Sequence, residues 1–315
     1  MENQRKKVSI ITPFYNEGEG IDYFYESLSK VLNEISDLDF EVVCIDDGSH
    51  DNTLEKLISL TEKDARFQVV ELSRNFGKEA ALTSGIDVAT GDAVIPIDAD
   101  LQDPPELIQE MIEQWKQGAE VVLARRVDRS SDSFFKRGTS SIFYRVHNHL
   151  SSIQLPENVG DFRLMDRIVV DGLKQLPERH RFMKGLFAWV GFETVTLDYV
   201  RDPRKAGSTK FSGLKLWNFA LEGFTSFSTI PLKLWTYIGG MGAIVTFFYA
   251  SFIILRTIIY GIDLPGYASL LVVVLFFGSL QLISVGILGE YIGRIYMETK
   301  NRPVYLIKKR HGVKN

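Results

Sequence analysis

The sequence predicts an α/β domain with a mostly parallel sheet, followed by amphipathic helices and a two-helix transmembrane hairpin. Apolar, β-branched runs alternate with amphipathic stretches over residues 1–126. Two long runs without Asp, Glu, Lys or Arg follow residue 230, and basic residues are frequent after them. Strands that alternate with helices in this way form a parallel sheet that helices cover on both faces.

Strands and helices are expected in strict alternation in the first part of the chain. The strand-like runs are 8–12, 40–46, 67–72, 93–98 and 120–125, and the helical stretches are 21–35, 53–63, 79–88 and 104–117. Ligands of such sheets bind beyond the carboxyl ends of the strands. GxGxxG does not follow the first strand and GxxxxGK[ST] is absent, which disfavours a dinucleotide dehydrogenase and a P-loop enzyme.

Charge and cysteine content exclude further classes. The net charge of -4 and the pI near 5.8 argue against a nucleic-acid binder, which usually carries a strongly basic surface. Cys44 is the single cysteine, so no internal disulfide forms, as expected in a reducing compartment. It lies in the apolar run 42–45, which favours an inert core thiol over a nucleophile.

Two carboxylates follow the fourth expected strand. Asp98 and Asp100 are two residues apart, so an extended chain projects both to one face. Paired carboxylates ligate Mg²⁺ or Mn²⁺, which bridges phosphate oxygens, and we interpret the pair as a metal or diphosphate site. The alternative is an acidic turn that caps the next helix. That role fits Asp103 better, because Pro104 and Glu106 occupy first-turn and capping-box positions.

A second acidic pair, Asp46 and Asp47, follows the second expected strand. A carboxylate at such a position can accept a hydrogen bond from a base or a ribose hydroxyl. One of the two is expected to shape the turn, and Asp47 is the candidate for the nucleoside contact.

The uncharged runs cover 234–255 and 264–289, and each is long enough to cross a hydrocarbon core of about 30 Å. We interpret them as a hairpin with spans at 234–255 and 266–289, in preference to two buried helices of a soluble core. Basic residues flank the pair on its outer sides, so the positive-inside rule places both ends and the preceding domain in the cytosol.

Two stretches have one apolar face at helical spacing. In 213–229 the apolar residues lead directly into the first span, which favours a helix in the membrane interface. In 142–150 a core helix is an equally good interpretation.

Ordered motifs along the whole chain resemble a known family. They are PFYNE (13–17), DDGS (46–49), RNFGKE (74–79), DADLQDP (98–104), NVGDFRL (158–164), TKF (209–211) and GEYIGR (289–294). With the two spans, they resemble inverting family 2 glycosyltransferases of the GT-A fold. More narrowly, they resemble polyprenyl-phosphate glycosyltransferases, and most of all the bactoprenol (undecaprenyl-phosphate) glucosyltransferases of O-antigen modification in lipopolysaccharide.

The resemblance implies roles for individual residues. Asp161, Asp100 and Arg201 would be the catalytic residues, and Asp98 and Asp100 would hold the metal. The donor and the phosphates would be bound by Pro13, Tyr15, Glu17, Asp47, Lys78, Asp98, Gln102, Arg125, Arg137 and Lys210.

The resemblance also implies a reaction and a place for it. A single glucose would move from UDP-glucose, with inversion and with Mg²⁺ or Mn²⁺, to undecaprenyl phosphate. The enzyme would be a homo-oligomer in the bacterial inner membrane, with its catalytic domain in the cytosol. The Gln-x-x-Arg-Trp signature of processive synthases has its nearest counterpart at 178–182 but lacks the Trp, which favours single-sugar transfer.

The implied organisation has five parts. They are a nucleotide-sugar half (1–126), an acceptor half with an interfacial helix and a basic loop (127–212), an interface helix (213–229), the transmembrane hairpin (230–293) and a basic cytosolic tail (294–315).

Asp161 has two possible roles: a general base, or a carboxylate that orients Arg163 and the acceptor. Because an acceptor phosphate is already ionised near pH 7, a general base is less necessary. Arg201 and Lys210 are interpreted as a phosphate seat, whereas the alternative is a solvated basic loop beside anionic lipid. The rival functions are a scaffold that binds a nucleotide sugar without turnover and a transferase that acts on protein or glycan hydroxyls.

Overall fold

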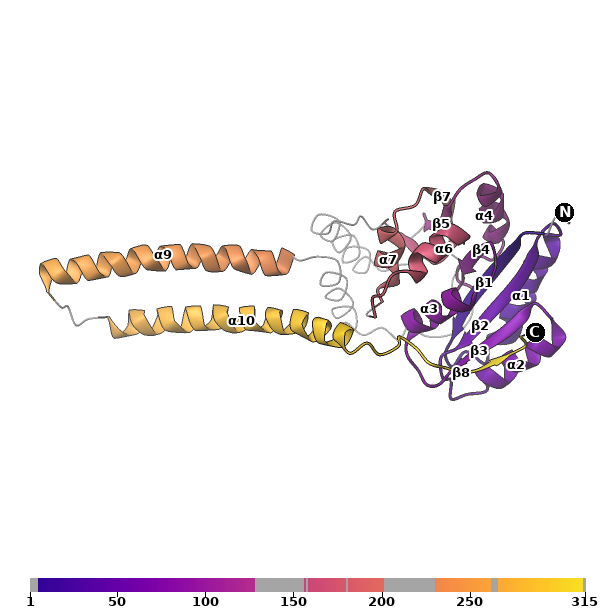
Figure 1. Ribbon diagram of the computed structural model, residues 1–315, viewed down its shortest axis with the longest axis horizontal. Helices are drawn as coiled ribbons and strands as arrows, with labels where there is room; N and C mark the ends of the chain where they lie inside the picture. The colour runs from indigo at the N-terminus through magenta and orange to yellow at the C-terminus, as the bar shows by residue number, and fades with distance from the viewer. Residues whose placement is uncertain are drawn as a thin grey trace.

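The computed structural model describes residues 5–127, 156, 158–179, 181–200, 230–261 and 266–313. The expected stretches 142–150 and 213–229 lie outside the described residues, as do Arg137, Arg201 and Lys210. An α/β domain lies at one end of the molecule, and two long helices extend from it side by side (Figure 1).

The described strands form one mixed sheet in the order β7-β5-β6-β4-β1-β2-β3-β8. The strands are β1 (Lys7–Phe14), β2 (Asp39–Asp46), β3 (Phe67–Leu72), β4 (Ala93–Pro96), β5 (Val121–Arg126), β6 (Val159–Asp166), β7 (Thr194–Tyr199) and β8 (Ile307–His311). Strands β1 to β4 pair in parallel, as predicted. Strand β6 is inserted antiparallel between β4 and β5, which makes the sheet mixed.

Helices cover both faces of the sheet (Figure 1). They are α1 (Ile21–Glu34), α2 (Thr53–Lys63), α3 (Lys78–Val88), α4 (Leu107–Lys116), α6 (Arg167–Lys174) and α7 (Met183–Trp189). Helices α1, α2 and α4 share a core with Ile10 of β1, whereas α3, α6 and α7 share one with the next residue, Ile11. Successive strand residues are therefore buried on opposite faces, which explains the continuous apolar runs in the sequence.

Cys44 lies within the first of these cores and is buried. Burial raises the pKa of its thiol well above the usual value. A protonated, inaccessible thiol is inert, in agreement with the interpretation of Cys44 as a core residue.

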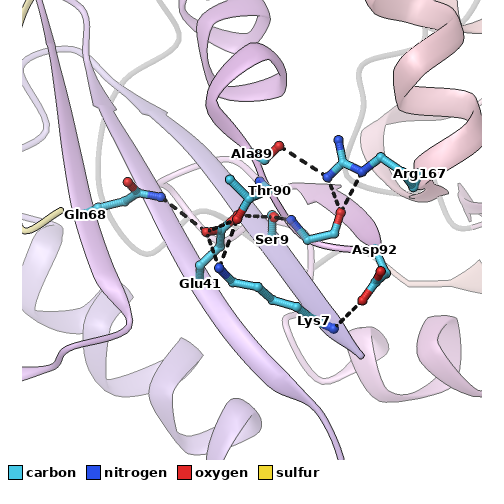
Figure 2. A network of polar contacts seen from close by, with 9 residues as sticks. Lys7, Ser9, Glu41, Gln68, Ala89, Thr90, Asp92 and Arg167 are labelled. Atoms are coloured by element: carbon cyan, nitrogen blue, oxygen red, sulfur yellow. Dashed lines mark hydrogen bonds and ion pairs between the residues drawn. The ribbon is translucent and has the colours of Figure 1, made fainter. Parts of the chain in front are cut away.

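A buried carboxylate, Glu41 of β2, organises the amino-terminal edge of the sheet (Figure 2). Ser9 donates its hydroxyl to Glu41, and the Thr90 backbone N–H and hydroxyl donate to it at 2.6 and 2.9 Å. Lys7 adds an ion pair at 2.9 Å. Burial would raise the pKa of Glu41, but these partners together hold it below its usual value. This network lies at the edge of the sheet opposite the carboxyl ends of β1 to β4, so its role is structural.

Glu41→Ala is expected to lower the free energy of unfolding by about 3 kcal/mol, because it leaves the buried Ser9 hydroxyl and the Thr90 N–H without this acceptor and removes the ion pair with Lys7. Thermal unfolding of the full chain in detergent measures the effect. Glu62→Ala, at an exposed position of α2, is the matched control and should change little. Equal melting temperatures for the two variants would contradict the assigned role.

The two long helices are α9 (Ile230–Tyr260) and α10 (Tyr267–Thr299). Within the described residues, one segment, Val273–Thr299, is long and apolar enough to cross a membrane, with a mean hydropathy of 1.8. Large apolar side chains are exposed on both helices, among them Phe248 and Leu282. Exposed apolar surface of this extent is typical of contact with lipid or with another protein.

Helix α10 ends ten residues beyond the expected end of the second span at 289. Glu290 and Arg294 lie one turn apart and form an ion pair at 3.1 Å, which favours continuation of the helix. The chain then returns to the α/β domain, where β8 pairs antiparallel with β3 at the edge of the sheet. Lys308 and His311 of β8 both contact Glu71 of β3, at 2.6 and 3.2 Å. Part of the expected basic tail is therefore an edge strand.

Candidate active site

The candidate site residues gather at the carboxyl ends of β1, β2 and β4. Because these strands are parallel, the residues that follow them meet at one edge of the sheet. Strand β6 is antiparallel to β4, so its first residues, including Asp161, lie at the same edge. This arrangement brings together residues from two distant parts of the sequence.

Lys78, the first residue of α3, connects two of the predicted carboxylates. Its Nζ lies 2.7 Å from Asp98 Oδ1 and 2.8 Å from Asp161 Oδ2. Burial disfavours the ammonium, but the two carboxylates outweigh this effect and raise the pKa of Lys78. We call Lys78, Asp98 and Asp161 the central cluster, and its lysine is charged throughout the working pH range.

Asp161 is the most enclosed carboxylate of the central cluster, with its side chain 17% exposed. Burial would raise its pKa, but Lys78 first, and then Lys184 and Arg163, hold the pKa of Asp161 below its usual value. Its Oδ1 is buried and has no hydrogen-bond partner among the described residues. Asp161 is therefore an anion at neutral pH, with one oxygen committed to Lys78.

Arg163, two residues further along β6, is buried at 4% exposure. It donates to the Gly160 carbonyl at 2.7 Å, and its guanidinium lies 4.0 Å from the centre of the Phe187 ring on α7. Burial lowers the pKa of Arg163 to about 10, although Asp161 acts in the opposite direction. The charges of Asp161 and Arg163 thus act on each other, and the positioning role of Asp161 stays a prediction.

Glu79 was not singled out by the sequence, although it belongs to the motif at 74–79. Its Oε2 accepts the backbone N–H of Met183, the first residue of α7, at 3.3 Å. Burial, and then the negative charge of Asp161, raise the pKa of Glu79 to about 7. Glu79 therefore connects α3 to α7 beside the central cluster.

Glu79→Gln is expected to change how stability depends on pH. In the parent, the pKa of Glu79 is about 7 in the folded state and about 4.5 in the unfolded chain. The stability linked to this difference is fully present below about pH 4.5 and is lost as the pH rises to about 7, because the buried carboxyl then has to ionise. Glutamine has no proton to lose, so the melting temperature of the variant minus that of the parent should increase between about pH 5 and pH 8. Differential scanning fluorimetry at pH 5 and at pH 8 measures this difference in melting temperature. A difference that is constant or that falls with pH would contradict the raised pKa.

Asp98 and Asp100 lie in a tight turn after β4. The Leu101 N–H donates to the Asp98 carbonyl at 3.2 Å, and Leu101 has a φ of 43°, which is rare for a residue other than glycine. Asp100 Oδ1 accepts from the Gln102 N–H at 3.2 Å. Both carboxylates are partly exposed and offer the hard oxygen ligands that Mg²⁺ and Mn²⁺ prefer.

The described residues contain no group of three or more His, Cys, Asp and Glu side chains arranged to hold a metal ion. The metal-binding role of Asp98 and Asp100 stays a prediction.

The expectation that Asp103 caps the following helix is wrong. Helix α4 begins only at Leu107, and no side chain caps it. Asp103 is buried and instead accepts the hydroxyl hydrogen bond of Tyr199 on β7. The consecutive prolines 104 and 105 delay the helix, since the Leu107 N–H bonds to the Pro104 carbonyl.

Asp47 fixes the loop that leads into α3. Its two carboxylate oxygens accept the backbone N–H groups of Phe76 and Gly77 at 2.7 and 2.9 Å. Burial raises the pKa of Asp47 despite these bonds. Asp46 accepts from Ser49 at 3.3 Å, while its Oδ1 is buried without a partner among the described residues. Both aspartates therefore shape this region, and the nucleoside contact of Asp47 stays a prediction.

The remaining predicted residues lie around this edge of the sheet. Pro13 is the second-last residue of β1, and the exposed Tyr15 follows the strand. The Glu17 N–H donates to the Thr53 hydroxyl at 3.0 Å. Arg125, near the end of β5, forms a bidentate ion pair with Asp198 on the surface, with hydrogen bonds of 2.7 and 2.9 Å. The Arg125 guanidinium is thus bound to a carboxylate of β7. The predicted contact of Arg125 with a substrate phosphate stays a prediction.

A cavity of about 270 Å³ adjoins the central cluster. Its lining includes Lys78 and Glu79 of α3, Arg179 and Arg181, and Val304 of the returning chain. Arg179 is held by the end of α10, because its backbone N–H donates to Glu298 at 3.0 Å. The cavity therefore lies between the central cluster and the segment that leaves α10.

Comparison with known proteins identifies the family. The model described as glycosyl transferase family 2 matches residues 9–173. The chain is similar to the bactoprenol glucosyl transferase of Shigella phage SfII, with 52% identity over 305 residues, 97% of this chain and 98% of that one. It is also similar to the prophage bactoprenol glucosyl transferase homolog of Escherichia coli K12, with 52% identity over 96% of this chain and 99% of the relative.

An uncharacterized glycosyltransferase of Synechocystis is 50% identical over 98% of this chain and 96% of its own. Among solved structures, the glucosyl-3-phosphoglycerate synthase of Mycobacterium tuberculosis with UDP aligns with a TM-score of 0.47 at 19% identity, covering 70% of this chain and 78% of that one. The resemblance seen in the motifs is confirmed. With a GT-A-like mixed sheet and one long apolar carboxy-terminal helix, the chain belongs to glycosyl transferase family 2.

Proposed function

We propose that this glycosyltransferase moves a single glucose from UDP-glucose, with inversion, to the phosphate of undecaprenyl phosphate at the cytosolic face of the bacterial inner membrane. The similarity to relatives named bactoprenol glucosyl transferases carries the proposal, because it covers 97% of the chain, including both long helices. The product is a lipid-linked sugar donor for modification of a cell-surface glycan. The exposed apolar surface of α9 and α10 supports contact with the lipid in which such an acceptor resides.

Within this proposal, α9 and α10 form a transmembrane hairpin with spans at 234–255 and 266–289. The domain parts 1–126 and 127–212, the interface helix 213–229 and the segment 294–315 are then all cytosolic. The return of the chain after α10 to pair with β3 supports this arrangement, because it requires β8 and the α/β domain to be on one side.

Reporter fusions test this topology. A reporter fused after Asn315 is expected in the cytosol, and one inserted between Tyr260 and Pro265 is expected in the periplasm. Alkaline phosphatase and green fluorescent protein fusions distinguish the two compartments. Two reporters on the same side would contradict the hairpin.

The donor diphosphate is proposed to lie against Asp98, Asp100 and Gln102, with Lys78 beside it. Asp98 and Asp100 would hold Mg²⁺ or Mn²⁺, which would supply positive charge against the leaving diphosphate. Lys78 supplies a fixed positive charge at the same edge of the sheet, and preorganised charge of this kind lowers the barrier where negative charge develops. Pro13, Tyr15, Glu17 and Asp47 are the proposed nucleoside contacts, and Arg125, Arg137, Arg201 and Lys210 the phosphate contacts.

The acceptor phosphate is proposed to be the nucleophile. One of its oxygens forms a bond to C1 of glucose on the face opposite UDP, and the bond between C1 and the UDP oxygen breaks with its electron pair leaving on UDP. The second pKa of a phosphate monoester is about 6, so the acceptor is ionised at neutral pH and no proton has to move. The low pKa of Asp161 supports this mechanism, because it makes that carboxylate a weak base.

A donor and acceptor screen tests the function. Purified full-length protein in detergent is incubated with undecaprenyl phosphate and, in turn, labelled UDP-glucose, UDP-galactose, UDP-N-acetylglucosamine and GDP-mannose. We expect a labelled lipid mainly with UDP-glucose, its loss in EDTA, and its recovery on addition of excess Mg²⁺ or Mn²⁺. Bound donor without a labelled lipid would instead support a scaffold, and full activity in EDTA would contradict the metal site.

A further inference from the structure

Several positive charges surround Asp161, and they are not equivalent. Lys78 is engaged with two carboxylates of the central cluster. Arg163 is buried, bonded to a carbonyl and stacked on Phe187. Lys184 of α7 is only half-buried and lies one turn before Phe187, the ring on which Arg163 stacks, and its positive charge helps to hold down the pKa of Asp161.

Lys184 differs from its neighbours in having its charge available. Among the residues that the structure describes, no hydrogen bond or ion pair engages its ammonium group. Lys184 also follows Met183, whose backbone N–H donates to Glu79 at 3.3 Å, and its positive charge partly opposes the rise in the pKa of Glu79. A partly exposed ammonium beside a candidate catalytic carboxylate is suited to bind an anionic group of a substrate.

The position of Lys184 is set by its helix. Helix α7 has seven residues, and Lys184 is the second of them, next to the Met183 N–H that Glu79 accepts at 3.3 Å. The Thr83 hydroxyl of α3 contacts Met183 Sδ at 3.7 Å, which adds a second contact between the two helices. Glu79 therefore holds the first turn of α7 against the helix that begins with Lys78.

We propose that Lys184 binds a substrate phosphate and that Glu79 is the positioning residue that holds Lys184 beside Asp161. This inference rests on the proposed transfer between a nucleoside diphosphate sugar and a lipid phosphate, which supplies two sources of that phosphate. Lys184 is thereby added to the proposed phosphate contacts, of which Arg137, Arg201 and Lys210 lie outside the described residues.

Lys184→Gln is expected to raise either the KM for undecaprenyl phosphate or the KM for UDP-glucose by about tenfold or more, because one charge-assisted hydrogen bond is lost. The substrate whose KM rises identifies the source of the phosphate. Lys184→Arg keeps the charge and should recover part of the affinity. Lys174→Gln, at an exposed lysine of α6, is the matched control and should leave both KM values unchanged.

The role of Glu79 is tested by a double-mutant cycle. Glu79→Ala should raise the same KM as Lys184→Gln, whereas Glu79→Gln keeps an oxygen acceptor for the Met183 N–H and should stay near the parent. Adding Glu79→Ala to Lys184→Gln should raise that KM little further, since both changes remove one contact. A purely structural glutamate would lower the melting temperature and leave KM unchanged.

Equilibrium binding separates this inference from the proposed function. Undecaprenyl phosphate in detergent and UDP-glucose are titrated separately into parent and Lys184→Gln protein, without turnover. Weaker binding of either substrate by the variant supports the inference even where the parent transfers no glucose. Unchanged binding of both substrates, together with unchanged KM values, would overturn it.

Discussion

Replacement of Lys78 with glutamine is expected to lower the rate of glucose transfer by about a thousandfold. The ammonium lies 2.7 Å from Asp98 and 2.8 Å from Asp161, so its loss leaves two carboxylates facing each other without the charge between them. The pKa of Asp161 should then rise, because Lys78 is the main group that holds it down. The acid limb of the pH–rate profile should therefore move to higher pH in the variant.

The control for Lys78 is a lysine of equal charge in a surface ion pair. Lys56 of α2 pairs with Asp22 at 2.9 Å, and Lys56→Gln should leave turnover unchanged. Initial rates at saturating donor and acceptor, with melting temperatures to show folding, measure both variants. A Lys78→Gln enzyme within threefold of the parent would remove Lys78 from the mechanism.

Asp161→Asn is the second change with a large expected effect, a loss of about a hundredfold or more in kcat/KM for the acceptor. In our account Asp161 acts as a fixed charge that orients Lys78, Arg163 and the acceptor. Its low pKa and its ion pair with Lys78 make it a poor proton acceptor. Truncation of Arg201 or Lys210, the predicted phosphate seat, should then be about as harmful as Asp161→Asn.

Turnover against pH and acceptor concentration distinguishes the two roles of Asp161. In the electrostatic account, saturating acceptor restores much of the rate of Asp161→Asn. If the variant stays several orders of magnitude slower at saturating acceptor while the Arg201 and Lys210 variants are nearly normal, Asp161 is the general base. A phosphate nucleophile would then be insufficient without proton transfer.

The parallel part of the fold could be predicted because its strands are buried on both faces. Strands β1 to β5 are continuous apolar runs, and each was predicted within a few residues. Strands β7 and β8 are not continuous buried apolar runs, so this pattern does not reveal them. Strand β8 has the sequence IKKRH, and only its pairing with β3 makes it a strand. Strand β6 includes Asp161 and Arg163, whose charges interrupt the apolar pattern that marks a strand.

Candidate residues of the site could be named from the sequence, but their arrangement could not. Asp98 and Asp161 stood out through motifs, whereas the link that Lys78 makes between them depends on strands far apart in sequence. Glu79 belongs to the motif at 74–79 but was not singled out, and Lys184 carried no local signal, because the roles proposed for them depend on the contact between α3 and α7. Asp103 illustrates the opposite case, in which a good local capping pattern was overridden by a tertiary hydrogen bond to Tyr199.

In the proposed reaction, a lipid phosphate oxygen accepts the glucose. The most direct measurement compares undecaprenyl phosphate with undecaprenol, the same lipid without the phosphate, as acceptors for UDP-glucose. Mass spectrometry of the extracted lipids identifies the products. We expect undecaprenyl phosphate carrying one hexose, with one UDP released per product and no glucosylated undecaprenol. Comparable transfer to the lipid alcohol, or a product carrying several hexoses, would contradict it.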